Sequence, residues 1–312
     1  MPLRQRTKFL ITMKTNFFIT ALLLGLSISF SSCKKDSEDT DSVFNADQQV
    51  SKDQNQIDHE SEDVGAMQDD LMAANEGRLF ARTAVTDTVY TFPFDSCATV
   101  TLIPKGNNPT GKITVDFGTG CQGRDGRFRR GKIEWTFTDR LRKPGSVIET
   151  RFINYGVKPQ NASEYINIDN SSTKTTTNLS TSEAFNDNSI LLFRRDINMK
   201  LNFSDNTSFT YSGTKNLKWD LSILGYRWDN TYTLNAGSQL SGTDRQGRPW
   251  SMTVNTDVVR KAACALSGVY KPVSGTLTIL HGNKTKFIDF GNGACDNSIT
   301  ITINGAVRRT RW

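Results

Sequence analysis

The chain has 312 residues, five cysteines, two histidines and a formal net charge of +6. So few histidines exclude catalysis by a histidine-cluster metal site. No phosphate-cradling loop or dinucleotide fingerprint is present, so we expect no cofactor. No nucleophile elbow is present either, and a serine hydrolase would have to recruit His281, which we expect at a loop tip. Glycoside hydrolysis stays open because it needs only two carboxylates, for which the candidates are Glu134, Glu149 and Glu164.

Residues 1–32 have the three parts of a secretory signal peptide. A basic start precedes an apolar run over residues 17–30, and small residues then lead to Cys33. The apolar run has about 14 residues, too few for the ~20 of a transmembrane helix. Its end, Leu-Ser-Ile-Ser-Phe-Ser-Ser-Cys, resembles a bacterial lipobox, in which the cysteine is diacylated and becomes the mature N-terminus. A plain cleavable signal is the alternative, and translation begins at Met1 or Met13.

The lipobox resemblance implies a membrane partner. Acyl chains on Cys33, palmitate among them, would anchor the protein, because each buried methylene contributes about 0.8 kcal/mol. The start Cys-Lys-Lys-Asp-Ser-Glu-Asp resembles the acidic export signal of Bacteroidota surface lipoproteins. This resemblance implies the cell outer membrane and exposure on the cell surface, with the periplasm-facing leaflet as the alternative.

Residues 33–82 are expected to form a lipidated, acidic and disordered tether. Residues 34–75 hold twelve acids against three bases, a net charge of −9, and few aromatic or β-branched residues. Such a segment buries too little apolar surface to fold, and charge repulsion extends it. Within it, apolar residues recur at helical spacing and predict a short helix over residues 61–76.

The remainder of the chain is basic: residues 76–312 hold 31 Lys and Arg against 20 Asp and Glu, a net charge of +11. A basic body outside the cell indicates anionic partners, namely acidic polysaccharide, lipid phosphates, extracellular DNA or the acidic tether itself. The densest basic runs are residues 124–132 and 308–311, and we favour the interpretation that both are solvated strand edges. No nucleic-acid-binding motif accompanies them, so no specific nucleic acid is expected. The candidate ligand-binding residues of the first run are Arg127, Arg129 and Arg130.

Residues 83–312 are expected to form one all-β domain. Ile133, Trp135 and Phe137 alternate with polar residues, and similar alternation recurs in short runs separated by Gly-, Asn- and Asp-rich turns. Period-two alternation with β-branched and aromatic residues is typical of half-buried antiparallel strands. We predict roughly twelve to fifteen strands, arranged as an antiparallel sandwich or as large twisted sheets.

Two stretches of this domain resemble each other, and each holds a cysteine, a strand, Asp-Phe-Gly-x-Gly and a second cysteine. They indicate a pseudo-duplicated body with one β-unit near each end. Four cysteines allow three pairings, and the repeat selects Cys97–Cys121 and Cys264–Cys295, each worth about 3–4 kcal/mol. A zinc site is the alternative, but Cys-x-x-Cys spacing is absent.

The aspartates of the repeated triplets, Asp116 and Asp289, are expected to cap glycine turns by accepting backbone hydrogen bonds. Calcium binding is the alternative, and it is weak because one carboxylate falls far short of the about six to eight oxygen ligands of calcium. Protein kinases use the same triplet to hold metal, but no kinase phosphate loop or catalytic-loop motif accompanies it here.

As a whole, the chain resembles a family of uncharacterised Bacteroidota lipoproteins. In that family a lipobox and an acidic tether precede an all-β body with Asp-Phe-Gly-x-Gly-Cys and then Gly-Arg-x-Arg-x-Gly-Lys-Ile. The second motif is here Gly-Arg-Phe-Arg-Arg-Gly-Lys-Ile, at residues 126–133. The resemblance covers most of residues 97–303; it implies location and fold, and carries no function.

The five tryptophans are candidates for a sugar-stacking platform. Trp135 and Trp219 lie in alternating runs and are expected in the core. Trp228 lies in a turn-like context and is the best candidate for an exposed aromatic residue. Near it, Arg245 and Arg248 could add hydrogen-bond donors for acidic groups.

These patterns together predict a lipid-anchored envelope or cell-surface lipoprotein that is not an enzyme and has a binding or structural role. Its expected partners are the membrane, through the anchor, and either an anionic glycan or an envelope protein. A carbohydrate-active enzyme and an acidic-glycan-binding module are the alternatives.

Overall fold

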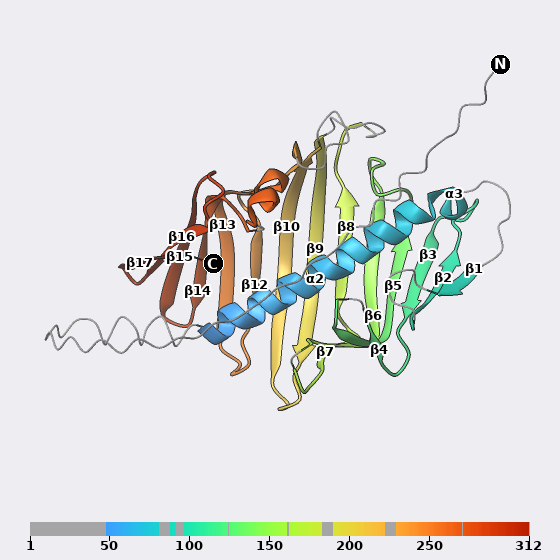
Figure 1. Ribbon diagram of the computed structural model, residues 1–312, viewed down its shortest axis with the longest axis horizontal. Coiled ribbons are helices and arrows are strands. Elements are labelled where there is room, and N and C mark those ends of the chain that lie inside the picture. The colour runs from blue at the N-terminus through green and yellow to red at the C-terminus, as the bar shows by residue number, and fades with distance from the viewer. Residues whose placement is uncertain are drawn as a thin grey trace, which may run out of the picture. The chain divides into compact units, whose positions relative to one another are not determined.

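The computed structural model describes residues 48–80, 88–91, 97–123, 125–160, 162–182, 190–221, 229–269 and 271–311. The predicted signal peptide, Cys33 and Trp228 lie outside these residues. The described part of the chain is all-β, as expected: seventeen strands form one antiparallel sheet, and a long helix lies across one face of it (Figure 1). We call the face that carries this helix the inner face and the opposite one the outer face.

The strands follow one another along the sheet in chain order. They are β1 (Thr88–Thr91), β2 (Thr99–Ile103), β3 (Gly111–Asp116), β4 (Cys121–Gln122), β5 (Phe128–Phe137), β6 (Val147–Lys158), β7 (Ile166–Ile168), β8 (Thr173–Asn178), β9 (Ile190–Asn202), β10 (Ser208–Asp220), β11 (Thr231–Leu234), β12 (Gln239–Thr243), β13 (Pro249–Lys261), β14 (Ser274–His281), β15 (Lys284–Asn292), β16 (Ser298–Ile303) and β17 (Ala306–Arg311).

The pairing pattern is a meander. The short strands β4, β7 and β11 share positions in the sheet with β3, β8 and β12, and all other neighbours in sequence are neighbours in the sheet. Antiparallel neighbours need only short connections, which the Gly-, Asn- and Asp-rich turns provide. Of the two architectures expected from the sequence, the large sheet is the one that forms.

The helices within the described residues are α2 (Gln48–Ala74), α3 (Glu76–Leu79) and the 3₁₀ helix η2 (Ala262–Ser267). α2 has 27 residues and begins well before the predicted helix over residues 61–76. The prediction of a disordered tether is therefore wrong for residues 48–80, while residues 33–47 lie outside the described part. The reason is tertiary, because the apolar stripe of α2 is buried against the sheet. That stripe consists of Val64, Met67, Leu71 and Met72.

The core lies between α2 and the inner face of the sheet. In β5 the alternating Ile133, Trp135 and Phe137 are fully buried, and one cluster of buried side chains extends from β2 to β16. The prediction that Trp135 is a core residue is confirmed. Trp219 is only partly buried, and it packs on Phe193 of a smaller cluster with the ring centroids 4.7 Å apart. Each such large apolar side chain contributes about 1.5–3 kcal/mol when fully buried.

Two disulfides join the cysteines that the repeat selected. Cys97 is bonded to Cys121, and Cys264 is bonded to Cys295. The first disulfide closes the β2–β3 hairpin, and the second closes the β14–β15 hairpin. The two β-units therefore lie near opposite ends of the sheet, as the repeat predicted.

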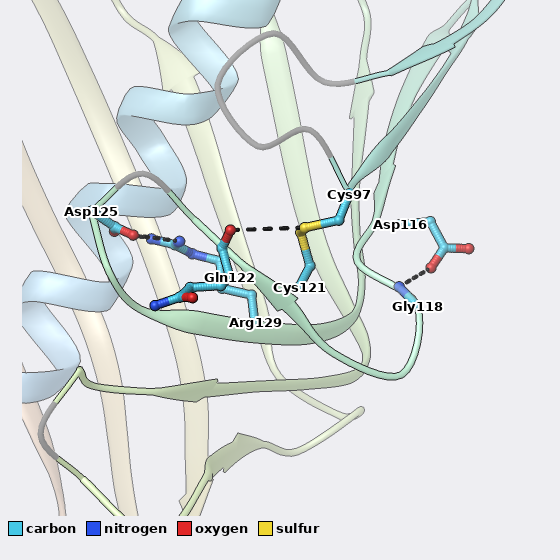
Figure 2. Close-up of a disulfide and its surroundings, with 7 residues drawn as sticks. All are labelled: Cys97, Asp116, Gly118, Cys121, Gln122, Asp125 and Arg129. Carbon is cyan, nitrogen blue, oxygen red and sulfur yellow. Dashed lines mark hydrogen bonds and ion pairs between the residues drawn. A yellow bond between two sulfur atoms is a disulfide. The ribbon is translucent and has the colours of Figure 1, made fainter.

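The aspartates of the two Asp-Phe-Gly triplets accept backbone hydrogen bonds from nearby glycines. Asp116 does so at the turn that follows β3, and Asp289 does so within strand β15. The Asp116 carboxylate accepts a hydrogen bond from the Gly118 N–H at 2.8 Å, and Asp289 accepts one from the Gly291 N–H at 2.8 Å. Figure 2 shows the first of these bonds beside the Cys97–Cys121 disulfide. The predicted backbone hydrogen bond is confirmed for both aspartates, but only Asp116 caps a turn, since Gly291 belongs to strand β15.

The two basic runs occupy different places in the sheet. Residues 308–311 lie on β17, an edge strand that pairs only with β16 among the described residues, so the interpretation as a charged strand edge is confirmed there. Residues 128–132 of the other run lie on β5, which is paired on both sides. The edge interpretation is wrong for that run.

Candidate functional site

Successive residues of a strand point to opposite faces of the sheet, and this alternation divides the basic run at the start of β5. Arg127 and Arg129 contact α2 on the inner face, whereas Arg130 packs on Tyr165 on the outer face. The inner cluster consists of Glu60, Asp63, Asp125, Arg127 and Arg129. The outer cluster consists of Phe128, Arg130, Lys158, Tyr165 and Asn167.

In the inner cluster, Arg129 is only 3% exposed and has two carboxylate partners. Its Nη2 lies 2.8 Å from Oδ2 of Asp63, on α2. The same atom lies 2.6 Å from Oδ2 of Asp125, in the turn before β5, and Figure 2 shows this second pair. Nη1 of Arg127 lies 3.3 Å from Glu60 and 3.5 Å from Asp63. Two arginines that were candidates for binding an external ligand are therefore paired with acids that we expected in a free tether. Among the anionic partners that the charge indicated, the chain's own N-terminal segment is the one found here.

Burial shifts the pKa values of this cluster. It raises the pKa of Glu60 from 4.5 to about 7, and the attraction of Arg127 offsets only part of the effect. It also raises the pKa of Tyr155, which interacts with Glu60 and Arg129. Burial acts in the same direction on Asp125, but the hydrogen bond from Arg129 and the other bonds to this carboxylate outweigh it and hold its pKa below the ordinary value. Glu60 is therefore close to half-protonated near neutral pH.

A second set of polar contacts holds α2 over β8. Lys174 is 1% exposed, and its Nζ donates a hydrogen bond to the backbone carbonyl of Ser61 at 3.0 Å. Asp69 lies further along the helix, where burial raises its pKa to about 6 although Arg195 and Lys174 both act to lower it. Polar and apolar contacts thus alternate along the buried side of α2.

The sequence patterns did not predict the roles of Glu60, Asp63 and Lys174. Part of the signal was present, since Glu60 lies four residues before Val64 and therefore on the apolar stripe of the helix. The contacts themselves gave no local signal, because Glu60 and Arg127 are 67 positions apart in the chain, and Lys174 and Ser61 are 113 positions apart.

Arg245 and Arg248 lie in the β12–β13 hairpin, on a part of the sheet separated from β5 by several strands. The Arg245 guanidinium lies 4.0 Å from the ring centroid of Phe203, and Arg248 pairs with Asp244 at 2.7 Å. Trp228, their expected neighbour, lies outside the described residues. The structure therefore gives both arginines partners within the body and does not bring them together with the arginines of β5.

His281 is not at a loop tip, as we had expected. It is the last residue of β14 and is 6% exposed, because it shares the inner face with the buried Ile279 two residues earlier. Its Nε2 lies 2.8 Å from Oδ2 of Asp244, which itself is 1% exposed. The pair ties the β12–β13 hairpin to β14.

The carboxylates proposed for glycoside hydrolysis lie on polar surface. Glu134 lies 3.5 Å from Lys112, and Glu149 pairs with Arg151 at 2.6 Å. Glu164 is exposed. Two of these three candidates, Glu134 and Glu149, therefore each have a basic partner on the sheet.

Metal binding finds no support in the described part of the chain, where no group of three or more His, Cys, Asp or Glu side chains could hold an ion. The carboxylate of Asp116 pairs through Oδ2 with Lys132 at 2.8 Å, in addition to capping its turn. The weak calcium alternative at Asp116 and Asp289 therefore gains nothing from the geometry.

The outer face has an open hollow of about 600 Å³ over β10, β12 and β13. Small polar residues such as Ser212, Thr214 and Gln239 line it, together with Arg194. Thr214 already donates a hydrogen bond to Asp196 at 2.7 Å, and Arg194 pairs with the same carboxylate at 3.0 Å. The hollow is therefore a weaker candidate than the two clusters at β5.

Comparisons with protein-family models, with curated proteins and with solved structures find no match to this chain. Among the described residues, no helix combines the length and the apolar character needed to cross a bilayer.

Proposed function

We propose that this protein is a lipid-anchored lipoprotein of the cell outer membrane, exposed on the cell surface, with a non-catalytic binding or structural role. The lipobox-like run that ends at Cys33 supports the anchor, and the Lys-Lys-Asp-Ser-Glu-Asp run after it supports the surface location. The resemblance to Bacteroidota lipoproteins supports both.

The observation that carries this proposal is the pair of disulfides, Cys97–Cys121 and Cys264–Cys295. Disulfides persist in oxidising compartments outside the cytosol and are rare within it. All four cysteines after Cys33 are used in them, which leaves Cys33 as the one cysteine with a separate role. An acylated N-terminal cysteine is the role that the preceding apolar run favours.

The docking of α2 changes how the body would be held. Because α2 begins at Gln48, only residues 34–47 separate Cys33 from the described body. A chain of 14 residues spans at most about 50 Å when fully extended. We therefore propose a body held close to the membrane surface, in place of the longer tether that the charge pattern indicated.

The proposed role is non-catalytic because the most perturbed groups act within the fold. Glu60 and Asp69 have raised pKa values where α2 meets the sheet, and their basic partners belong to the sheet. Perturbed groups mark active sites when they line a cleft, and these two lie on the side of α2 that is packed against the sheet. A carbohydrate-active enzyme and an acidic-glycan-binding module are the alternatives, and the outer cluster favours the binding module.

The test is expression of the full chain in a bacterium that acylates lipoproteins. We expect mass spectrometry to find Cys33 as the acylated N-terminus, with the protein in the outer-membrane fraction and sensitive to protease added to intact cells. Cys33→Ala should release the protein from the membrane, whereas Ser32→Ala, which keeps a small residue before the cleavage site, should not. An unmodified N-terminus at Met1 or Met13 in the soluble cytoplasmic fraction would refute the proposal.

A further inference from the structure

The outer cluster lies where β5 and β6 pair on the face opposite α2. In the register of these strands Arg130 faces Gly156, and Phe128 faces Lys158. Tyr165 precedes β7, the next short strand along the sheet. All of these side chains except the glycine are partly exposed, so the cluster is open to solvent.

The Arg130 guanidinium is held in one orientation. It lies 4.4 Å from the ring centroid of Tyr165, and its Nη2 donates a hydrogen bond to Oδ1 of Asn167 at 2.7 Å. Gly156 makes room for this arrangement, since a Cβ at that position would lie 2.7 Å from Oδ1 of Asn167 and 3.1 Å from Nε of Arg130. Because the guanidinium is already stacked and hydrogen-bonded, it has little conformational freedom left to lose. Binding of an anion therefore costs less conformational entropy.

Lys158 places a second positive charge beside Arg130. Its Nζ lies 4.7 Å from the ring centroid of Phe128 and 5.5 Å from that of Tyr165. Two cations therefore share the ring of Tyr165, an arrangement that cation–π attraction stabilises.

Neither cation of the outer cluster has a carboxylate partner among the described residues. This distinguishes Arg130 from Arg127 and Arg129 in the same run, which have acids from α2 and from the turn before β5. It also distinguishes Arg130 from Arg151, on the same face of β6, which pairs with Glu149. Adjacent like charges without counter-ions repel one another, and an external anion would relieve that repulsion.

The geometry points to a binding site for the carboxylate or sulfate groups of an acidic polysaccharide, formed by Arg130 and Lys158 on the platform of Tyr165, Phe128 and Asn167. An arginine recognises two oxygens of one carboxylate or sulfate group with two parallel hydrogen bonds. The aromatic rings and the Asn167 amide supply the contacts that sugar rings and hydroxyl groups need. The cluster is an open surface and not an enclosed pocket, which suits an extended polymer with repeated charges.

This inference deepens the proposed binding role and rests on it only for the supply of polysaccharide at the cell surface. Binding itself is a property of the body. It can be measured on purified full-length protein in detergent, whether or not Cys33 is acylated. Failure of the anchor and failure of the binding site are therefore separate results.

The experiment measures binding of the full-length protein to immobilised dextran sulfate, polygalacturonate and uncharged dextran at rising salt. We expect binding to one or both of the acidic polymers, none to dextran, and an affinity that falls as salt rises. Dextran sulfate distinguishes sulfate from the carboxylate of polygalacturonate. Arg130→Gln with Lys158→Gln should weaken binding about tenfold or more, because charge-assisted hydrogen bonds are lost.

Arg151→Gln is the matched control, since it removes the same charge from the same face but from an arginine that is already paired. It should change the affinity less than about twofold. If circular dichroism shows that the double variant is misfolded, Lys158→Gln alone decides, because its side chain makes only ring contacts among the described residues.

Three results would overturn the inference: no binding to either acidic polymer, equal loss of binding in the control and the cluster variants, or unchanged binding in the cluster variants. Tighter binding of duplex DNA than of either polysaccharide through the same two residues would also overturn it, since the site would then serve a nucleic acid.

Discussion

Arg129 on β5 and Asp63 on α2 form an ion pair at 2.8 Å that joins residues 66 positions apart in the chain. The arginine is almost fully buried, and it pairs at the same time with Asp125. The contact makes the acidic segment part of the folded body. It also removes this arginine from any role in binding an external anion.

Arg129→Gln should lower the free energy of unfolding by about 3 kcal/mol, because it leaves carboxylates in a buried site without their cation. Arg151→Gln removes an arginine from an exposed ion pair and should cost less than about 1 kcal/mol. Urea denaturation of both variants measures the difference. Equal effects would mean that the inner cluster contributes no more than an ordinary surface pair.

The stability of the protein should fall as pH rises through about 7. The pKa of Glu60 is raised from 4.5 to about 7 in the folded protein. Its contribution is therefore fully present below about pH 4.5 and is lost as pH rises through about 7. Asp69, with a pKa raised to about 6, acts in the same direction over a slightly lower range.

Glu60→Gln isolates this effect, because the amide stays neutral at every pH. The shift from 4.5 to about 7 corresponds to at most about 3 kcal/mol. We expect thermal denaturation to show that stability falls less from pH 5 to pH 8 in the variant than in the wild type. A parallel pH dependence in the two proteins would show that Glu60 titrates normally in the folded state.

Leu71→Ala should cost about 3 kcal/mol, because Leu71 is 1% exposed between α2 and the sheet. Asp70→Ala, at the exposed neighbouring position of the same helix, should change stability by less than about 0.5 kcal/mol. Chemical denaturation measures both variants, and limited proteolysis within residues 48–74 should be faster for Leu71→Ala. If Leu71→Ala left the free energy of unfolding unchanged, the interpretation of this segment as a free tether would be restored.

Each disulfide should stabilise the body by about 3–4 kcal/mol on the loop-entropy model, since the bonds close loops with sequence separations of 24 and 31. Mass spectrometry of peptides from unreduced protein should find Cys97 with Cys121 and Cys264 with Cys295. Urea midpoints of the Cys97→Ser/Cys121→Ser and Cys264→Ser/Cys295→Ser variants measure each bond separately. Peptides with crossed pairing would contradict the echo between the two hairpins.

Local sequence patterns predicted a large part of the fold. The alternation of Ile133, Trp135 and Phe137 predicted a strand with one buried face, because a side chain's face follows from its position in the strand. The repeated Asp-Phe-Gly-x-Gly-Cys predicted both disulfides and the backbone hydrogen bonds of both aspartates, because these features lie within hairpins that are contiguous in sequence.

Patterns of charge predicted less of the structure. Acid-rich composition indicated a solvated segment, yet Glu60 and Asp63 are paired with sheet residues that no local pattern connects to them. Composition counts charges but does not say which of them meet. The same limit placed the run 124–132 on a strand edge and His281 on a loop tip.

The sequence by itself determined the strand-forming pattern, the cysteine pairs and the expectation of a lipid anchor, since each depends on residues that are near neighbours in the chain. Only the tertiary structure decided that α2 folds onto the sheet, and that Arg129 faces its acids while Arg130 faces solvent. The physical reason is that burial and charge pairing are settled by contacts across distant parts of the chain, where a one-residue step along β5 moves a guanidinium from one face of the sheet to the other.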